Sequence, residues 1–331
     1  MRIAILAVDS MFDSGLAVML DVLATANALR GEAAATTTPF EVTVTGIRNE
    51  VRTGHALHLA TTPLAELAAP PDLLVMPAVG LRAPAEVIEI VRGHPALGYV
   101  AAAYRDGTAL AAACSGTFFL AEAGVLDGRV ATTSWWLSPA FRSRYAAVQL
   151  RDSAIVVGDD RITTAGAAFA HIDLALSVVQ RQSPALAELT ARYLLIGDRP
   201  SQAVFAVPSL LARSDPTITA FERWVREHVA EPVQISRAAA AISVSERTLQ
   251  RTTAAVLGMS PIDFVHEIRL DQATFLLRTT SLTADAVAAA VGYQNTSTLR
   301  ALVRRRRGST ISALRRGGSG SAEEPGQRKP S

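Results

Sequence analysis

The sequence predicts two folded parts: a doubly wound α/β domain, with helices on both faces of its sheet, followed by an all-α domain. Three observations support this fold class. The 331 residues are 49% apolar, which is enough for two hydrophobic cores. The first ~200 residues alternate short β-rich runs with runs of helical periodicity. From Thr217 onward the pattern is helical, and one motif occurs twice.

The strands of the first domain are predicted by short runs of apolar and β-branched residues. These runs are Arg2–Val8, Phe40–Gly46, Asp72–Pro77, Thr108–Ala113 and Ala154–Gly158, with Arg161–Thr164 as a returning hairpin strand. Apolar residues at helical spacing predict the helices Leu16–Leu29, Pro84–Val91, Gly116–Ala123 and Phe169–Gln180. This alternation favours a flavodoxin-like sheet covered on both faces.

The domain boundaries are marked by residues that break regular structure. Gly197–Ser201 reads Gly-Asp-Arg-Pro-Ser, and Val207 is followed by Pro and Ser, so a linker is expected here. The tail lacks large apolar residues and is expected to be disordered. The predicted organisation is a first domain over 1–196, a linker over 197–216, a second domain over 217–316 and a tail over 317–331.

Charge is divided unevenly along the chain. Residues 1–200 contain 15 Arg and 19 Asp or Glu, a net charge of −4. Residues 201–331 contain 16 Arg, one Lys and 11 Asp or Glu, a net charge of +6. A basic segment suits a polyanion, because neutralising phosphates releases their counterions. Double-stranded DNA is therefore an expected partner.

Other classes of protein are not expected. Ile3–Val8 is too short for a signal peptide, and no apolar run has the ~18 residues needed to span a bilayer. Cys114 is the only cysteine, which excludes an internal disulfide and a multi-cysteine zinc site. No cluster of His, Asp and Glu has ligand spacing, so no metal and no cofactor are expected. These observations predict a cytoplasmic protein without a membrane partner.

The repeated motif of the second domain lies within Ile235–Gly308. Each copy has a capping residue, a leucine four positions later and a glycine nine positions after that leucine. The first copy has Ser245, Leu249 and Gly258, and the second has Asn295, Leu299 and Gly308. An alanine-rich helical segment precedes each cap. Helix, turn and capped second helix form the helix-turn-helix plan, in which the second helix enters the major groove of DNA.

The two copies differ in the residues that face away from their leucines. In the first copy, Arg can bind guanine and Gln can pair with adenine, so base contacts are expected. In the second copy, hydroxyls and arginines suit phosphate contact or weaker base contact better than strong base readout. Two or three of Arg304–Arg307 are expected to contact phosphate, the alternative being a solvated cationic face. The residues expected to contact DNA are Arg247, Gln250, Arg251, Thr296, Ser297, Thr298, Arg300 and Arg304.

A helix between the two copies is expected to hold them apart. Ser260 and Pro261 start it, and it runs to Leu277. About 18 residues would give a helix of ~27 Å, a suitable strut for two recognition helices in major grooves that recur every ~34 Å.

Residues 217–316 resemble the DNA-binding domain of the AraC/XylS family of transcription regulators. The matching segments are Ser245–Arg251, Gly258–Pro261, Ile268–Leu270, Leu276–Leu277, Val291–Tyr293 and Gly308–Thr310. The resemblance implies that Arg247, Gln250 and Arg251 read bases, with Thr296, Ser297 and Arg300 as their counterparts. The sequence departs from the family pattern with Ser243 at a turn glycine, Ile311 at a proline, Leu314 at a tyrosine and Ala301 at a position often basic.

Cys114 lies where a predicted strand turns into a predicted helix. Such a turn exposes a side chain above the sheet, and the helix N–H groups are expected to lower the thiol pKa. The alternative is a small buried cysteine.

Cys114–Trp136 is similar to the ThiJ/PfpI superfamily, which shares the class I glutamine amidotransferase sheet. The resemblance covers about 1–190 and is closest to GlxA-like regulators, which join this domain to an AraC-type module. In the enzymes of this superfamily a histidine pairs with the cysteine. Ser134 stands in its place, and serine cannot act as a base near neutral pH. Asp13 is a candidate for the acidic partner near the first strand.

We therefore expect no catalytic residue, and a first domain that senses a small molecule and/or forms a homodimer. His55, His58 and His171 are expected to be structural or exposed. The candidate ligand-binding residues are Cys114, Ser115, Gly116, Asp13, Gly80, Ser134 and Trp135, with the amides of Ser115 and Gly116 as anion donors.

The expected function is that of a sequence-specific DNA-binding transcription regulator. Its partners would be promoter DNA, an unidentified small-molecule effector, a second copy of the chain and, as a further candidate, RNA polymerase. Two alternatives stay open: a cysteine-dependent hydrolase or amidase tethered to DNA, and a redox or electrophile sensor at Cys114.

Overall fold

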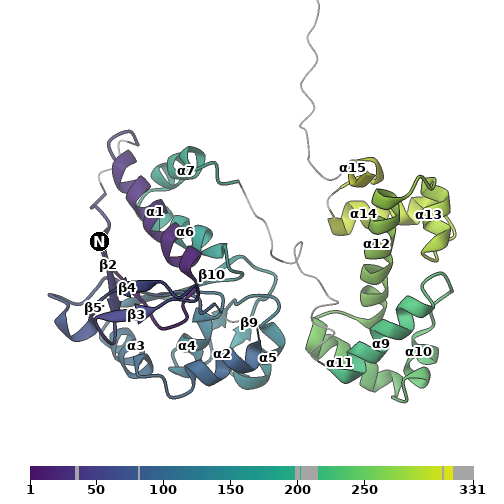
Figure 1. Cartoon of the computed structure of the whole chain (residues 1–331), viewed down its shortest axis with the longest axis horizontal. Helices are drawn as coiled ribbons and strands as arrows, with labels where there is room; N and C mark the ends of the chain where they lie inside the picture. Colours follow the sequence, from purple (N-terminus) through teal and green to yellow (C-terminus); the bar gives the residue numbers. More distant parts are fainter. Residues whose placement is uncertain (34–36, 81–82, 198–201, 203–214, 308, 316–331) are drawn as a thin grey trace, which may run out of the picture. The chain divides into compact units, whose positions relative to one another are not determined.

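The computed structural model describes residues 1–331 except 34–36, 81–82, 198–201, 203–214, 308 and 316–331 (Figure 1). The chain divides into two compact units, Met1–Ala206 and Val207–Ser331. The boundary between them falls within the linker expected over 197–216. Most of that linker, the tail expected over 317–331 and the motif glycine Gly308 lie outside the described residues.

The first unit is built on a seven-stranded sheet with the order β10-β11-β7-β6-β1-β2-β5 among the described residues. These strands are β1 (Arg2–Leu6), β2 (Glu41–Gly46), β5 (Thr62–Pro63), β6 (Leu73–Met76), β7 (Ala109–Ala113), β10 (Val156–Asp159) and β11 (Ile162–Ala165). All neighbours pair in parallel except β10 and β11, which form an antiparallel hairpin. The expected hairpin turn lies at Asp160, which has a positive φ of 53°.

Helices cover both faces of this sheet (Figure 1). One face carries α1 (Asp13–Leu29), α6 (Ala170–Gln182) and α7 (Pro184–Tyr193), and the other carries α2 (Pro84–Val91), α3 (Ala96–Arg105), α4 (Gly116–Glu122) and α5 (Ser138–Arg144). The central strands β1, β6 and β7 are buried along most of their length, since parallel strands between two helix layers expose neither face. The predicted doubly wound α/β fold is confirmed.

Smaller elements surround the sheet. They are the two-stranded pairs β3 (Glu50–Arg52) with β4 (His58–Ala60) and β8 (Val130–Ala131) with β9 (Gln149–Leu150), and the short helix η1 (Leu64–Glu66). The β3–β4 hairpin carries the segment around His55, so it bears on the site below.

The second unit is helical throughout its described part. Its helices are α9 (Pro216–Glu227), α10 (Ile235–Ala241), α11 (Glu246–Leu257), α12 (Pro261–Thr279), α13 (Ala284–Ala290), α14 (Thr296–Arg307) and α15 (Ile311–Arg315). The pairs α10–α11 and α13–α14 are the two expected helix-turn-helix units, and α12 is the helix expected between them. The all-α class of this part is confirmed.

The predicted caps form hydrogen bonds at the starts of these helices. The hydroxyl of Ser245 accepts the N–H of Thr248 at 3.0 Å, and that of Ser260 accepts the N–H of Asp263 at 3.2 Å. Such caps satisfy N–H groups that have no partner within the helix. Ser243, at the position where the family pattern has a turn glycine, adopts a φ of 60°.

Candidate nucleic-acid interface and cysteine pocket

The first recognition helix, α11, has one buried and one exposed face. Leu249, Thr253 and Leu257 are buried at intervals of one helical turn. Arg247, Gln250 and Arg251 are exposed on the opposite side, as the sequence predicts. The Gln250 amide lies 3.4 Å from the Glu246 carboxylate, a long contact that leaves it free to turn toward a base. This face can therefore offer two guanidinium groups and an amide to a groove.

The second recognition helix, α14, presents fewer of its predicted residues. Thr296 is buried and its hydroxyl donates to Asp285, so the expectation that it is free to face DNA is wrong. Ser297 and Thr298 are exposed, and both hydroxyls donate to the capping Asn295 side chain, at 2.6 and 2.9 Å. Thr296 is turned inward because the start of α14 packs on α13.

The arginine run at the end of α14 divides into two pairs. Arg304 and Arg305 are exposed, whereas the side chains of Arg306 and Arg307 are only 19% and 23% exposed. Arg306 and Arg307 bind Glu267 of α12 at 2.8 and 2.7 Å. Phosphate contact is therefore open to Arg304 and Arg305, while the other two arginines are occupied inside the fold.

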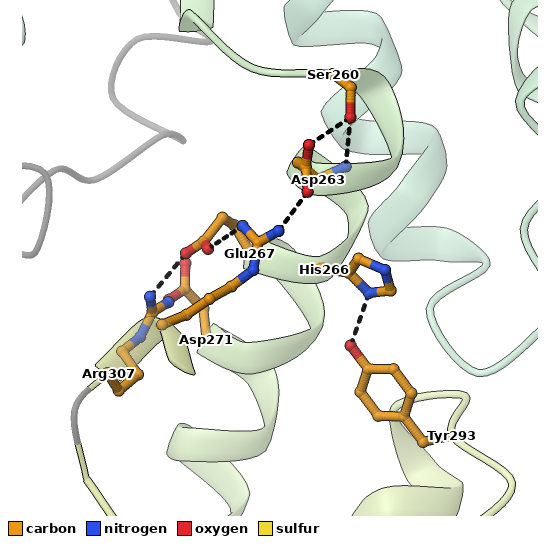
Figure 2. Close-up of polar contacts among 8 residues, drawn as sticks. Ser260, Asp263, His266, Glu267, Asp271, Tyr293 and Arg307 are labelled. Carbon is orange, nitrogen blue, oxygen red and sulfur yellow. Dashed lines mark hydrogen bonds and ion pairs between the residues drawn. The ribbon is translucent and has the colours of Figure 1, made fainter. Parts of the chain in front are cut away.

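The acceptors of these arginines form one row along α12 (Figure 2). Asp263, Glu267 and Asp271 follow one another at four-residue intervals, which places them on one helix face. Arg307 reaches Asp271 at 2.9 Å, and Arg306 also binds Asp263. Hydrogen bonding by Ser260 and Arg306 lowers the pKa of Asp263, whereas burial raises the pKa of Asp271.

A cationic groove of about 650 Å³ lies beside the exposed part of α14. Three arginines line it: Arg300 and Arg304 of α14 and Arg315 of α15. Ser309, Thr310 and Ser312 add hydroxyl-bearing side chains at its edge. Guanidinium groups next to hydroxyls are typical donors to phosphate oxygens.

In the first unit, Cys114 sits at the expected turn between β7 and α4. Its φ is 56°, a left-handed conformation that is uncommon for a residue with a side chain. The Cys114 N–H donates to the Ala165 carbonyl at 2.7 Å, and the Cys114 carbonyl accepts the Thr133 hydroxyl at 2.7 Å. The strained turn is therefore held from both sides.

The Cys114 thiol is buried, with the residue only 5% exposed. Burial raises its pKa, and hydrogen bonds from the Ser134 hydroxyl and the Ser115 backbone do not offset this. Of the two alternatives for this residue, the structure therefore shows the small buried cysteine and not the exposed thiol with a lowered pKa, because loss of solvation raises the thiol pKa more than the neighbouring hydrogen bonds lower it. Ser134 lies in the position predicted for a missing histidine, and its hydroxyl donates to Sγ at 2.7 Å.

Three of the candidate ligand residues hold the turn rather than line a pocket. The Ser115 hydroxyl donates to the Val79 carbonyl and accepts the Val79 N–H. A Cβ on Gly116 would lie 2.3 Å from the Met76 carbonyl oxygen, so only glycine lets α4 pack this closely on β6. Ser134 bonds to Cys114 and to the Ala167 N–H, 3.0 Å away.

A pocket of about 260 Å³ adjoins Cys114. It contains the predicted Asp13, Gly80 and Cys114. Its other lining residues are Phe12, Gly54, His55, Ala78, Val79, Trp136 and Ala168. Trp136 replaces the expected Trp135, whose backbone N–H donates instead to the buried Gln202 side chain at 3.1 Å.

Asp13 and His55 form a pair at the edge of this pocket. The His55 ring lies 2.8 Å from Oδ2 of Asp13, and the His55 backbone N–H also donates to that oxygen. Although burial raises the pKa of Asp13, hydrogen bonds from Thr53 and His55 lower it overall. Oδ1 of Asp13 is buried without a hydrogen-bond partner in the described part of the chain. It can therefore accept a donor from a ligand.

His171 is a structural histidine beneath the same site. Its Nδ1 contacts the Ala168 carbonyl at 2.5 Å, and its Nε2 accepts the Ala78 N–H at 3.2 Å. Burial lowers its pKa to about 4, so the ring is neutral at pH 7. A Cβ on Gly15 would lie 2.7 Å from this ring.

Residues 1–181 match the model of the DJ-1/PfpI family. The chain belongs to the DJ-1/PfpI family. Residues 238–317 match a second model, that of a helix-turn-helix domain, which covers most of α10 and all of α11, α13 and α14. The predicted combination of a ThiJ/PfpI-type domain with an AraC-type helix-turn-helix module is thereby confirmed.

Two relatives of this DJ-1/PfpI chain carry the same type of name. The HTH-type transcriptional regulator CdhR of Pseudomonas aeruginosa is 32% identical over 197 residues, which are 58% of this chain and 58% of that protein. The HTH-type transcriptional regulator GlxA of Rhizobium meliloti is 25% identical over 216 residues, 64% of this chain and 66% of that protein. Both matches span less than two thirds of the relative's length.

A solved structure shares the fold of the first unit. A THiJ/PfpI family protein from Pseudomonas syringae aligns with a TM-score of 0.50 at 18% identity, over 60% of this chain and 76% of that chain. Within the described residues, no helix is long and apolar enough to cross a membrane. No group of three or more His, Cys, Asp or Glu side chains there could hold a metal ion.

Proposed function

We propose that this chain is a sequence-specific DNA-binding transcription regulator. The observation that carries the proposal is the exposed face of α11, where Arg247, Gln250 and Arg251 lie opposite the buried Leu249. In a helix-turn-helix unit this face enters the major groove, where Arg binds guanine and Gln binds adenine. The names of the relatives CdhR and GlxA support the same function.

The two helix-turn-helix units divide the work of binding. The first helix-turn-helix unit, α10–α11, reads bases through α11. The second holds the sugar-phosphate backbone through Ser297, Thr298, Arg300 and Arg304, and Arg315 lines the same groove. Their contacts to phosphate position the protein on DNA, and Ser297 and Arg300, the counterparts of the base-reading residues of α11, add weaker base contacts. The second helix-turn-helix unit therefore carries less sequence information than the first.

The Met1–Ala206 unit acts as a non-catalytic domain that senses a small molecule and/or forms a homodimer. A cysteine hydrolase or a thiol sensor needs an accessible thiolate near neutral pH. Cys114 is buried with a raised pKa, and its bonded neighbour Ser134 cannot act as a base. The adjoining pocket suits a small ligand that donates a hydrogen bond to Oδ1 of Asp13 and packs on Phe12 and Trp136.

DNase footprinting of the full chain on the promoter of its own gene tests DNA binding. We expect a defined protected segment, and weaker binding by Arg247→Ala and Arg251→Ala. Each lost base contact is worth about 1–3 kcal/mol, or roughly 5- to 150-fold in affinity. Arg223→Ala, an exposed arginine on α9, is the matched control and should bind as the unchanged chain does. Protection without sequence preference, unaffected by either substitution, would contradict the proposal.

Thermal melting in the presence of a metabolite library tests sensing. A ligand of the pocket should raise the melting temperature of the full chain, and Asp13→Asn should abolish that rise. If no compound shifts the melting temperature and Cys114→Ala leaves regulation intact, sensing is excluded. The first unit would then serve dimerisation, which sedimentation of the full chain measures directly.

A further inference from the structure

The middle of α12 contacts both helix-turn-helix units through one side chain. Arg269 is buried at 6% exposure, near the centre of this 19-residue helix. Its Nη2 donates to the Glu231 carbonyl at 2.5 Å, and its Nη1 donates to the Gly292 carbonyl at 3.2 Å. Glu231 lies between α9 and α10, just ahead of the first helix-turn-helix pair. Gly292 lies in the turn between α13 and α14, within the second pair. One planar guanidinium group therefore bridges the turn of the second helix-turn-helix pair and the segment that leads into the first.

The two backbone segments meet closely at this bridge. Gly292 has a φ of 77°, and a Cβ there would lie 2.5 Å from Nη2 of Arg269 and 2.6 Å from the Val229 carbonyl oxygen. The turn between α13 and α14 thus lies directly against the end of α9. A fixed fork geometry suits Arg to this place, since each donor points at one carbonyl.

Neighbouring side chains of α12 hold the same turn and helix. The His266 ring lies 3.0 Å from the Tyr293 hydroxyl (Figure 2), and the Arg269 guanidinium lies 5.3 Å from the Tyr293 ring centre. Next to His266 in the chain, Glu267 accepts from Arg307 of α14 at 2.7 Å. His266 and Arg269 therefore hold the turn before α14, and Glu267 holds the end of α14. Of these three side chains, Arg269 also reaches Glu231, just ahead of α10.

We propose that Arg269 is a positioning residue that sets the spacing between the two DNA segments bound by α11 and α14. The proposal rests on the proposed function, in which these helices bind one DNA site. One inserted base pair moves the second segment by about 3.4 Å and turns it by roughly a tenth of a full turn. Two helix-turn-helix units held rigidly by Arg269 cannot adjust to this displacement of the DNA segment. Two units without the bridge can.

Selection from a library of duplexes with a random 30-base-pair core, by the full chain, tests this directly. The unchanged chain should select two segments at one spacing, and a one-base-pair insertion should weaken binding at least tenfold. Arg269→Met should accept the insertion with less than a threefold loss. Arg269→Lys, which keeps the charge but not the fork, should fall between them. Arg223→Met on α9 removes an exposed arginine and should keep the strict spacing.

A side chain that only stabilises the fold would lower the melting temperature and leave the spacing preference intact. If folded Arg269→Met keeps both the single spacing and the tenfold penalty, the proposal is overturned. If the unchanged chain selects no sequence at all, the proposed function fails instead.

A measurement without DNA covers the case in which Arg269→Met folds poorly. Spin labels at Ala255→Cys on α11 and Ala301→Cys on α14, in a Cys114→Ser background, report the distance between the two recognition helices. The full chain should give one narrow distance distribution, which Arg269→Lys should broaden. An unchanged distribution in that variant would overturn the proposal.

Discussion

Replacement of Glu267 by glutamine should lower the free energy of unfolding of the second unit more than the same replacement at an exposed carboxylate. Glu267 is the shared acceptor of Arg306 and Arg307, at 2.8 and 2.7 Å, and its side chain is only 9% exposed. Glu267→Gln keeps the shape but removes the charge, and its amide nitrogen takes the place of one acceptor oxygen, so one of the two arginines faces a donor instead. Breaking a buried ion pair costs about 3–5 kcal/mol.

The expected loss is smaller than that range for two structural reasons. The arginine side chains are about one fifth exposed, and each keeps a second carboxylate, Asp263 for Arg306 and Asp271 for Arg307. Solvent screening and these remaining partners reduce the loss to about 2 kcal/mol. For a unit of roughly 100 residues this lowers the melting temperature by about 8–16 °C.

Fluorescence of Trp224 during thermal unfolding measures this change. Trp135→Phe and Trp136→Phe leave Trp224, on α9, as the single tryptophan of the full chain, so the signal reports the second unit. Glu227→Gln, an exposed carboxylate on α9, is the control and should change stability by less than about 0.5 kcal/mol. If Glu267→Gln behaves like this control, the ion pairs do not hold α14 on α12.

Three further predictions concern the first unit. The pKa of His171 is lowered to about 4, so as pH falls below about 6.5 the imidazole of the unfolded chain is protonated before that of the folded chain. The free energy of unfolding, measured with urea, should therefore drop by about 2 kcal/mol between pH 7 and pH 5. His171→Gln should lack this pH dependence. Cys114 should resist iodoacetamide at pH 7.5 until the chain is unfolded, and rapid labelling of the folded chain, followed by mass spectrometry, would refute its burial. Gln202→Ala leaves the Trp135 N–H without its acceptor and removes the Nε2 contacts to Thr132, Thr133 and Ala154. The free energy of unfolding of the Met1–Ala206 unit, measured by calorimetry, should therefore fall by about 1–3 kcal/mol. Gln149→Ala, at an exposed position, should not change it.

Much of the fold follows from local sequence patterns. The core strands are recognised because each is a short apolar run, and the capped helices because Ser245, Ser260 and Asn295 mark their starts. The helix Ala96–Arg105 has no such signal: only Ala96 and Val100 of its residues are buried, and Gly98 interrupts it. The strands β3, β4, β8 and β9 have only two or three residues each, too few for a recognisable alternation.

The parts of the site that sequence could not give are those made by distant residues. Asp13 and His55 are 42 positions apart and meet only because the β3–β4 hairpin folds over the start of α1. The inward turn of Thr296 and the ion pairs of Arg306 and Arg307 depend on how α14 packs on α13 and α12. The raised pKa of Cys114 likewise comes from tertiary burial, which a local strand-to-helix pattern does not reveal.

The proposed function depends most on sequence-specific DNA binding by α11. The most direct measurement is the ratio of affinities of the full chain for its protected promoter segment and for a duplex of the same composition in scrambled order, at 0.15 M salt. Specific regulators typically reach a ratio of about 10³ or more. We expect a ratio in that range for this chain, reduced at least tenfold by Arg247→Ala. A ratio near one, unchanged by this substitution, would contradict the proposed function.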